Sequence, residues 1–206
     1  MRAFSLLKKQ SLFIAISSLF FLAACNNEDT KLPDISNIKV ELKSRNLAND
    51  LYAIDTNNIA TGLAGLSKEY PVFLNFYLDT LMGFAVQQNY TNDNPAITEG
   101  VHSFLTYKDY KNLHDTVLKY YPNTKDIEAE LTNGFRYLKH YYPNYEIPEV
   151  IFFQSGLQNW GVVSYDGILG IGLDMFLGEQ FPFYASVGQP SYMNINFRKE
   201  AIAPSV

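Results

Sequence analysis

The feature that most constrains the fold is a pair of strand-length apolar runs joined by a two-residue turn. The first run is Asn159–Tyr165 and the second is Ile168–Leu173, with Asp166-Gly167 between them. Aspartate followed by glycine is the strongest short signal for a β-hairpin, because both central residues of a type I′ turn need a positive φ angle. We therefore expect a hairpin here, with the rest of the chain packed around it.

Two glycines interrupt the second strand of this hairpin. Gly170 and Gly172 are two residues apart, so both face the same side of the strand. A strand face without side chains indicates that backbone, a packed aromatic ring or a ligand lies close against it. Asp174 ends the strand, and its carboxylate could act in catalysis, bind a metal ion, or cap the following turn through a local hydrogen bond. Gly170, Gly172 and Asp174 are therefore candidate binding residues.

An aromatic run, Phe181-Pro182-Phe183-Tyr184, follows the hairpin. One interpretation is a loop that packs on its own rings. The other is a docking place for a partner protein, because tyrosine and phenylalanine are enriched in the cores of protein interfaces. Phe181 and Tyr184 are accordingly candidate interaction residues.

The N-terminus has the features of a bacterial lipoprotein signal peptide. Residues 1–24 begin with three basic residues and continue with the apolar run Ser11–Leu22, which is short for a membrane span. The small residues before Cys25 resemble a lipobox, after which the thiol receives a diacylglyceryl group, and acyl chains such as palmitate anchor the protein in a membrane. The alternative is an ordinary secretory signal whose cleavage leaves a cysteine. Residues 25–34 are polar and are expected to form a tether.

Cysteine count and charge exclude several classes of protein. Cys25 is the only cysteine, so the exported domain contains no internal disulfide. Residues 1–24 hold three of the 16 basic residues and no acidic one, which leaves 13 basic against 21 acidic residues and a net charge of −8. A surface with that balance argues against nucleic acid as a partner.

The hydrophobic pattern predicts helices first and strands afterwards. Apolar residues recur at helical spacing in the segments 47–54, 63–70, 72–86, 96–107 and 110–121. The clearest helix begins after Asn123-Thr124, either of which can cap it, and ends before Pro143. Strands are predicted over 38–42 and Glu149–Gln154. These elements predict an α+β fold, with a helical N-terminal half followed by a small antiparallel sheet, in a single domain over 35–206.

No catalytic constellation is apparent in the chain. His102, His114 and His140 fall on three different predicted helices, and no His-Glu-x-x-His motif occurs. Ser155 follows a strand but lacks the flanking Gly-x-Ser-x-Gly of a hydrolase elbow. The sequence therefore predicts no catalytic residue, no metal site and no cofactor.

Several segments together resemble a known family, the gliding-motility lipoproteins called GldB, over most of the chain. They are Leu22–Cys25, Lys68–Pro71, His140–Pro143, Gly161–Val163, Gly170–Gly178, Phe181–Tyr184 and Arg198–Glu200. The resemblance implies a cell-envelope lipoprotein without assigned enzymatic activity, anchored at Cys25 on the periplasmic or surface side of the outer membrane. It also implies that the partners are other envelope proteins of gliding and secretion.

Two further functions stay open. The family is distantly similar to predicted zinc peptidases, so the chain could be a degenerate or incomplete zincin-like peptidase. It could also be a ligand-binding lipoprotein with a pocket near Gly170, Gly172 and Asp174. The resemblance further implies that family members continue beyond the point that matches Val206, so the domain is expected to be incomplete at its C-terminus.

Overall fold

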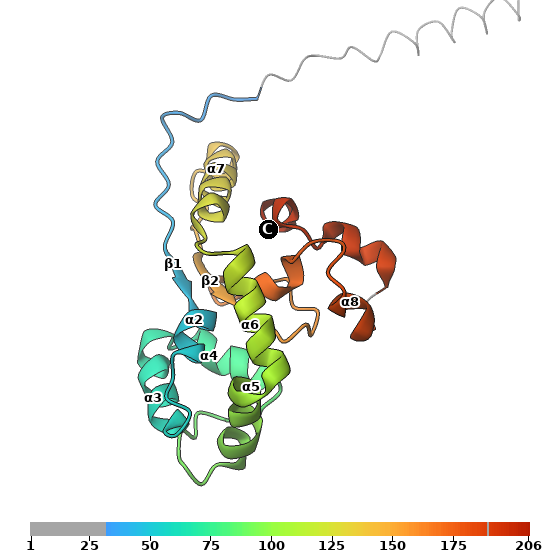
Figure 1. Ribbon diagram of the computed structural model, residues 1–206. Helices are drawn as coiled ribbons and strands as arrows, with labels where there is room; N and C mark the ends of the chain where they lie inside the picture. Colours follow the sequence, from blue (N-terminus) through green and yellow to red (C-terminus); the bar gives the residue numbers. More distant parts are fainter. Residues whose placement is uncertain (1–31, 189) are drawn as a thin grey trace, which may run out of the picture. The chain divides into compact units, whose positions relative to one another are not determined.

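A four-stranded mixed sheet lies at the centre of the domain in the computed structural model, which describes residues 32–188 and 190–206 (Figure 1). One compact unit spans Ile35–Val206. The expectations for the signal peptide and for Cys25 fall outside the described residues. The sheet has the order β1-β2-β4-β3, and its strands are β1 (Ser44–Asn46), β2 (Glu149–Phe153), β3 (Val162–Tyr165) and β4 (Ile168–Gly172).

The predicted hairpin is confirmed. Strands β3 and β4 pair antiparallel, with Tyr165 opposite Ile168. The two turn residues both have positive φ angles, 46° at Asp166 and 76° at Gly167, as a type I′ turn requires.

The rest of the sheet differs from the antiparallel arrangement that we predicted. Strand β2 pairs parallel with both β1 and β4, and only the hairpin itself is antiparallel. The connection from β1 to β2 runs through most of the helices and returns the chain to the same end of the sheet, which produces a parallel pair. The loop 154–161 then leads to β3 at the sheet edge, so the next strand, β4, lies beside β2 and runs in the same direction.

Helices make up most of the remaining chain, and the α+β class is confirmed. They are α2 (Leu47–Tyr52), α3 (Ile59–Glu69), α4 (Phe73–Asn75) with the π-helical segment Phe76–Leu81, the π-helical segment Ala96–Val101 with α5 (His102–Thr106), α6 (Lys108–Tyr120), α7 (Lys125–Tyr141), α8 (Phe183–Ser186) and the 3₁₀ turns Leu173–Phe176, Ser191–Asn196, Lys199–Ala201 and Ala203–Ser205. In the described part of the chain, none of these helices has the length and apolar character to cross a membrane.

The structure confirms one local prediction, a helix start, and contradicts another, a strand. The helix predicted after Asn123-Thr124 is α7, and the Asn123 side chain accepts a hydrogen bond of 3.1 Å from the Lys125 N–H at its start. The strand predicted over 38–42 is wrong. That stretch alternates half-buried and exposed side chains as expected, but it forms no ladder, and pairing with β2 begins only at Ser44.

Both faces of the two central strands, β2 and β4, are buried, which explains why residues 150–153 of β2 form an uninterrupted apolar run. Successive side chains of a strand point to opposite faces. Ile151 and Phe153 accordingly pack against the helices between residues 47 and 105. Val150 and Phe152 pack against α6, α7 and the C-terminal segment.

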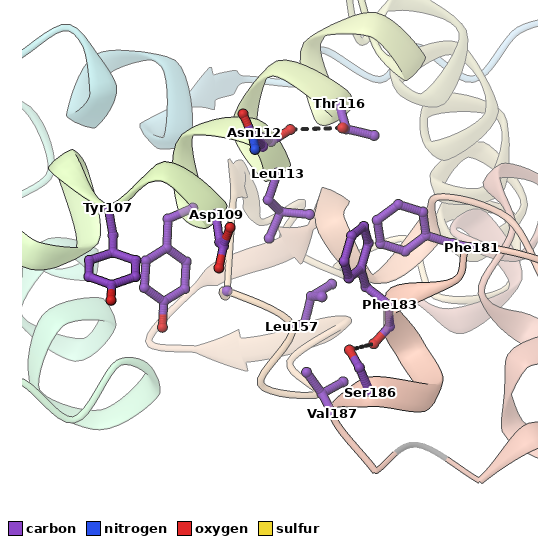
Figure 2. A pocket seen from close by; sticks show the side chains of 12 residues that line it. Tyr107, Asp109, Asn112, Leu113, Thr116, Leu157, Phe181, Phe183, Ser186 and Val187 are labelled. Atoms are coloured by element: carbon purple, nitrogen blue, oxygen red, sulfur yellow. Dashed lines mark hydrogen bonds between the residues drawn. The ribbon is translucent and has the colours of Figure 1, made fainter.

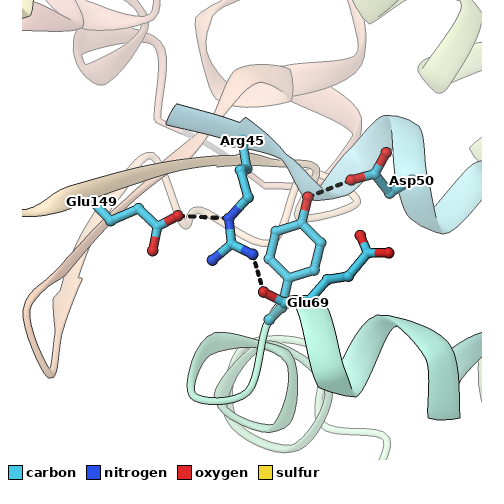
Figure 3. A network of polar contacts seen from close by, with 5 residues as sticks. Arg45, Asp50, Glu69 and Glu149 are labelled. Atoms are coloured by element: carbon cyan, nitrogen blue, oxygen red, sulfur yellow. Dashed lines mark hydrogen bonds and ion pairs between the residues drawn. The ribbon is translucent and has the colours of Figure 1, made fainter. Parts of the chain in front are cut away.

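A polar network at the edge of the sheet fastens β1 to its neighbours (Figure 3). The Arg45 guanidinium lies 2.6 Å from the Glu149 carboxylate on β2, and it also donates to the backbone carbonyl of Glu69 at the end of α3. It stacks 4.4 Å above the ring of Tyr70, whose hydroxyl donates to Asp50 on α2. Arg45 therefore links two strands and α3, and Tyr70 extends the network to α2.

Candidate interaction site

The two glycines of β4 accommodate close neighbours within the fold. A Cβ atom at Gly170 would lie 2.7 Å from a methyl group of Val163 and 2.8 Å from the ring of Phe73. A Cβ atom at Gly172 would lie 2.1 Å from the backbone carbonyl oxygen of Trp160. The sequence left backbone, an aromatic ring or a ligand as the neighbour of this strand face, and the structure places the first two there.

Asp174 is a fully buried carboxylate that organises the loop after β2. Its two oxygens accept hydrogen bonds from the Ser155 N–H at 2.8 Å, the Ser155 hydroxyl at 3.0 Å and the Leu157 N–H at 2.7 Å. Burial raises the pKa of Asp174 above its usual value, and these hydrogen bonds oppose that increase. The side-chain contacts of Asp174 are therefore made to residues 17 and 19 positions away, not to the adjacent turn at Met175.

The loop that Asp174 holds has an unusual backbone. Gly156, Leu157 and Asn159 all have positive φ angles, of 66°, 63° and 65°. A residue other than glycine in this region costs about 1–2 kcal/mol, so Leu157 is held there by its surroundings. The bond from its N–H to Asp174 supplies part of that restraint.

Tyr184 is buried and holds the aromatic run 181–184 in place through its hydroxyl and its ring. Its hydroxyl donates to the backbone carbonyl of Asp174 at 3.0 Å and accepts from the Leu177 N–H at 2.9 Å. Its ring packs edge-on against Phe181, with centroids 5.1 Å apart. Burial raises the pKa of Tyr184, so the hydroxyl stays protonated and remains a donor at neutral pH.

An open cleft lies in front of these buried groups, and we call it the aromatic cleft (Figure 2). Tyr107 and Asp109, at the start of α6, lie on one side of it, and Phe181 and Phe183 lie on the other. Its volume is about 380 Å³, within the range of small-molecule pockets. Tyr110, Leu113, Leu157, Ser186 and Val187 are also among its lining residues.

The cleft exposes apolar side chains that a folded protein usually covers. Tyr107 is 64% exposed, Phe183 57% and Val187 46%. Asp109 is the only residue with a charged side chain among the described residues that line it. No described residue forms a hydrogen bond or an ion pair with the Asp109 side chain. The cleft is thus a mainly apolar, aromatic surface with one free carboxylate and the neutral polar side chains of Asn112, Thr116 and Ser186.

A second polar cluster lies on another side of α6. The His114 ring stacks on Tyr52 with centroids 3.9 Å apart, and its Nδ1 lies 3.2 Å from the Gln154 side-chain oxygen. Burial lowers the pKa of His114, which favours the neutral imidazole. The buried Gln154 amide nitrogen has no hydrogen-bond partner among the described residues. His114 and Gln154 are therefore a buried polar pair within the core of the domain.

The three histidines lie on three different helices, as predicted: His102 on α5, His114 on α6 and His140 on α7. In residues 32–188 and 190–206, no three His, Cys, Asp or Glu side chains are grouped so that they could hold a metal ion.

The candidate residues from the sequence thus occupy three different places. Phe181 lines the aromatic cleft, whereas Asp174 and Tyr184 lie buried behind it and hold its walls. Gly170 and Gly172 are packed inside the sheet.

Sequence reasoning missed the wall that α6 contributes. Tyr107, Tyr110 and Leu113 are spaced by three residues, and such a spacing puts side chains on one face of a helix. The spacing was visible in the sequence, but a helix that packs into the protein core shows the same spacing, so it does not indicate a cleft.

Comparison with known proteins identifies one family. The family model described as gliding motility protein GldB matches residues 28–206 and so includes every residue of the aromatic cleft. No curated protein and no solved structure matches this chain.

Proposed function

The chain belongs to the family of the gliding motility protein GldB, and we propose that it supports gliding through protein–protein contacts made at the aromatic cleft. Membership implies a lipoprotein of the cell envelope that takes part in gliding motility. The contact role is the additional step, and the exposure of Tyr107, Phe183 and Val187 around one concave surface carries it.

The chemistry of the cleft suits a protein partner. Aromatic residues dominate the energetics of interfaces, especially where they line pockets near the centre of the contact. The cleft is also preformed, because Asp174 fixes its floor at Leu157 and Tyr184 fixes the wall beside Phe181. A preformed site loses less conformational freedom on binding, and this favours affinity.

The anchor places this domain close to a membrane in the proposal. Acylation of Cys25 holds the chain in the outer membrane, on its periplasmic or surface side. Nine residues then separate Cys25 from Ile35, where the compact unit begins. An extended chain spans at most about 3.5 Å per residue, so the tether reaches roughly 30 Å. The compact unit therefore begins within that distance of the membrane, and the proposed partners of the cleft are other envelope proteins.

The proposed role is non-catalytic. Asp174, the carboxylate that the sequence singled out, has all of its side-chain hydrogen bonds inside the protein and is 0% exposed. A general acid or base must come within hydrogen-bond reach of its substrate, and this carboxylate does not meet that condition. Its role in the proposal is to position the cleft.

The test is the gliding speed of cells whose chromosomal gene carries Phe183→Ala. We expect gliding to be lost or strongly slowed while the amount of the protein in membranes stays at the wild-type level. Tyr192→Ala is the matched control, since Tyr192 is 77% exposed but does not line the cleft. Equal gliding of the two strains at wild-type speed would exclude the cleft as the functional contact.

A further inference from the structure

We propose that the aromatic cleft binds an arginine side chain of the partner protein, flanked by an apolar residue. This inference rests on the proposed function and names the chemistry of the partner at the same site. Its basis is the pairing of a free carboxylate, Asp109, with the exposed rings of Tyr107 and Phe183 on one concave surface.

Charge complementarity selects a cation over an anion. Asp109 lies on the same side of the cleft as Tyr107, and no lysine, arginine or histidine is among the described residues that line the cleft. A carboxylate on the partner would therefore meet a like charge and no compensating one. Asp109 also lies in the first turn of α6, where an acidic residue favours the helix dipole, so it serves the helix without using its hydrogen-bonding capacity.

The aromatic walls select a cation with an apolar stem. A guanidinium or ammonium over an aromatic face is attracted by the negative face of the ring quadrupole. The methylene stems of arginine and lysine cover apolar surface while the charged end stays polar. In the aromatic cleft, the stem would lie over Leu113 and Leu157, with the charged end at Asp109 and Tyr107.

Arginine fits this surface better than lysine does. Its planar group stacks on rings and presents a fork of donors to a carboxylate, whereas the lysine ammonium is a compact, strongly hydrated charge. A volume of about 380 Å³ leaves room for a neighbouring side chain as well. An apolar residue next to the arginine would pack on Phe181 and Phe183 at the opposite side of the cleft.

The experiment measures binding of short labelled peptides to the full protein in detergent by fluorescence anisotropy. The probe peptide is Gly-Leu-Arg-Leu-Gly, and its counterparts carry glutamine, lysine or glutamate in place of arginine. The protein variants are Asp109→Asn and, as the matched control, Asp115→Asn. Asp115 is an exposed carboxylate on the same helix that does not line the aromatic cleft, so both variants lose the same charge.

We expect the arginine peptide to bind more tightly than the glutamine peptide, and the lysine peptide to fall between them. Asp109→Asn should weaken the arginine peptide by about fivefold, the size of one exposed ion pair, and leave the glutamine peptide unchanged. Asp115→Asn should change neither by more than about twofold, because a solvated charge outside the cleft is largely screened at physiological salt.

Three results would overturn this inference. The first is equal binding of the arginine and glutamine peptides, and the second is no measurable binding of the arginine peptide at millimolar concentration. The third is that the protein binds phosphatidylethanolamine vesicles but not the peptides, and that Asp109→Asn abolishes the vesicle binding. This result would mean that the cleft binds lipid amine headgroups. The proposed function is tested separately by the gliding speed of the Phe183→Ala strain. If Phe183→Ala stops gliding but Asp109→Asn does not weaken the arginine peptide, only the inference of an arginine ligand is refuted.

Discussion

Replacement of Asp174 with alanine should be among the most damaging single changes in the domain. The side chain is fully buried and accepts three hydrogen bonds, two from backbone N–H groups and one from a hydroxyl. A hydrogen bond to a charged acceptor is worth about 1.5–3 kcal/mol, and a buried donor left without a partner costs about 1–3 kcal/mol. The three bonds share one carboxylate and are not additive. We therefore expect a loss of about 3–5 kcal/mol in the free energy of unfolding, a large share of the 5–15 kcal/mol typical of a domain.

The assay is urea unfolding of the wild type and the variant, followed by circular dichroism and analysed by linear extrapolation. Ser155→Ala is the control, because it removes the hydroxyl but keeps both backbone donors paired with Asp174. The Ser155 hydroxyl also accepts a hydrogen bond from the Gln158 N–H at 3.2 Å, so Ser155→Ala should cost about 1.5–3 kcal/mol, still less than Asp174→Ala. Hydrogen exchange at the Leu157 amide should accelerate in Asp174→Ala more than in Ser155→Ala. An Asp174→Ala protein within 1 kcal/mol of the wild type would refute the reasoning, since it would mean that the loop 155–157 holds its shape without the carboxylate.

The other predictions concern packing, pH and surface charge. Gly172→Ala should destabilise more than Gly170→Ala in urea unfolding, because the new methyl group would lie 2.1 Å from a backbone oxygen in the first case and 2.7 Å from a side-chain methyl group in the second. Gly170→Ala should cost about 1–3 kcal/mol, as overpacking usually does, and equal effects of the two would contradict this ranking. The pKa of Asp174 is raised by burial, so the folded state takes up the proton first as the pH falls. The free energy of unfolding of the wild type, relative to Asp174→Asn, should therefore rise as the pH is lowered from 7 towards 4, and a relative fall would show that the hydrogen bonds outweigh burial. Asp126→Ala breaks an exposed ion pair with Lys199 and should leave the thermal midpoint of unfolding close to that of the wild type, because solvated ion pairs contribute little to stability.

Sequence reasoning succeeded where the signal was local. The hairpin turn at Asp166-Gly167 and the helix start at Asn123-Thr124 depend on a few adjacent residues whose backbone preferences are strong. The long-range pairing of β2 was not predictable in this way. Strand β2 pairs with β4 and not with β3, the strand that follows it in the sequence. That choice depends on the path of the loop 154–161 and on burial of both faces of β2.

The candidate site shows the same division. The aromatic run 181–184 marked one wall of the cleft, and Asp174 marked a special carboxylate. Neither pattern contained the partner groups. The donors to Asp174 lie 17 and 19 positions away, and the wall formed by Tyr107 and Asp109 lies more than 70 positions from Phe183. Contacts at such separations are set by tertiary packing, which a single sequence does not display.

The most direct test of the central claim asks whether a partner covers the aromatic cleft in cells. Cys25 is the only cysteine of the chain and is lipidated in the proposal, so Val187→Cys introduces a free thiol at the cleft. The measurement is its rate of reaction with a small membrane-permeant maleimide in gliding cells and in the purified protein, with Tyr192→Cys as the exposed control outside the cleft. We predict that Val187→Cys reacts readily in the purified protein and slowly in cells, while Tyr192→Cys reacts at similar rates in both. Equal reactivity of Val187→Cys in cells and in the purified protein would contradict the proposal that this cleft is a protein contact site.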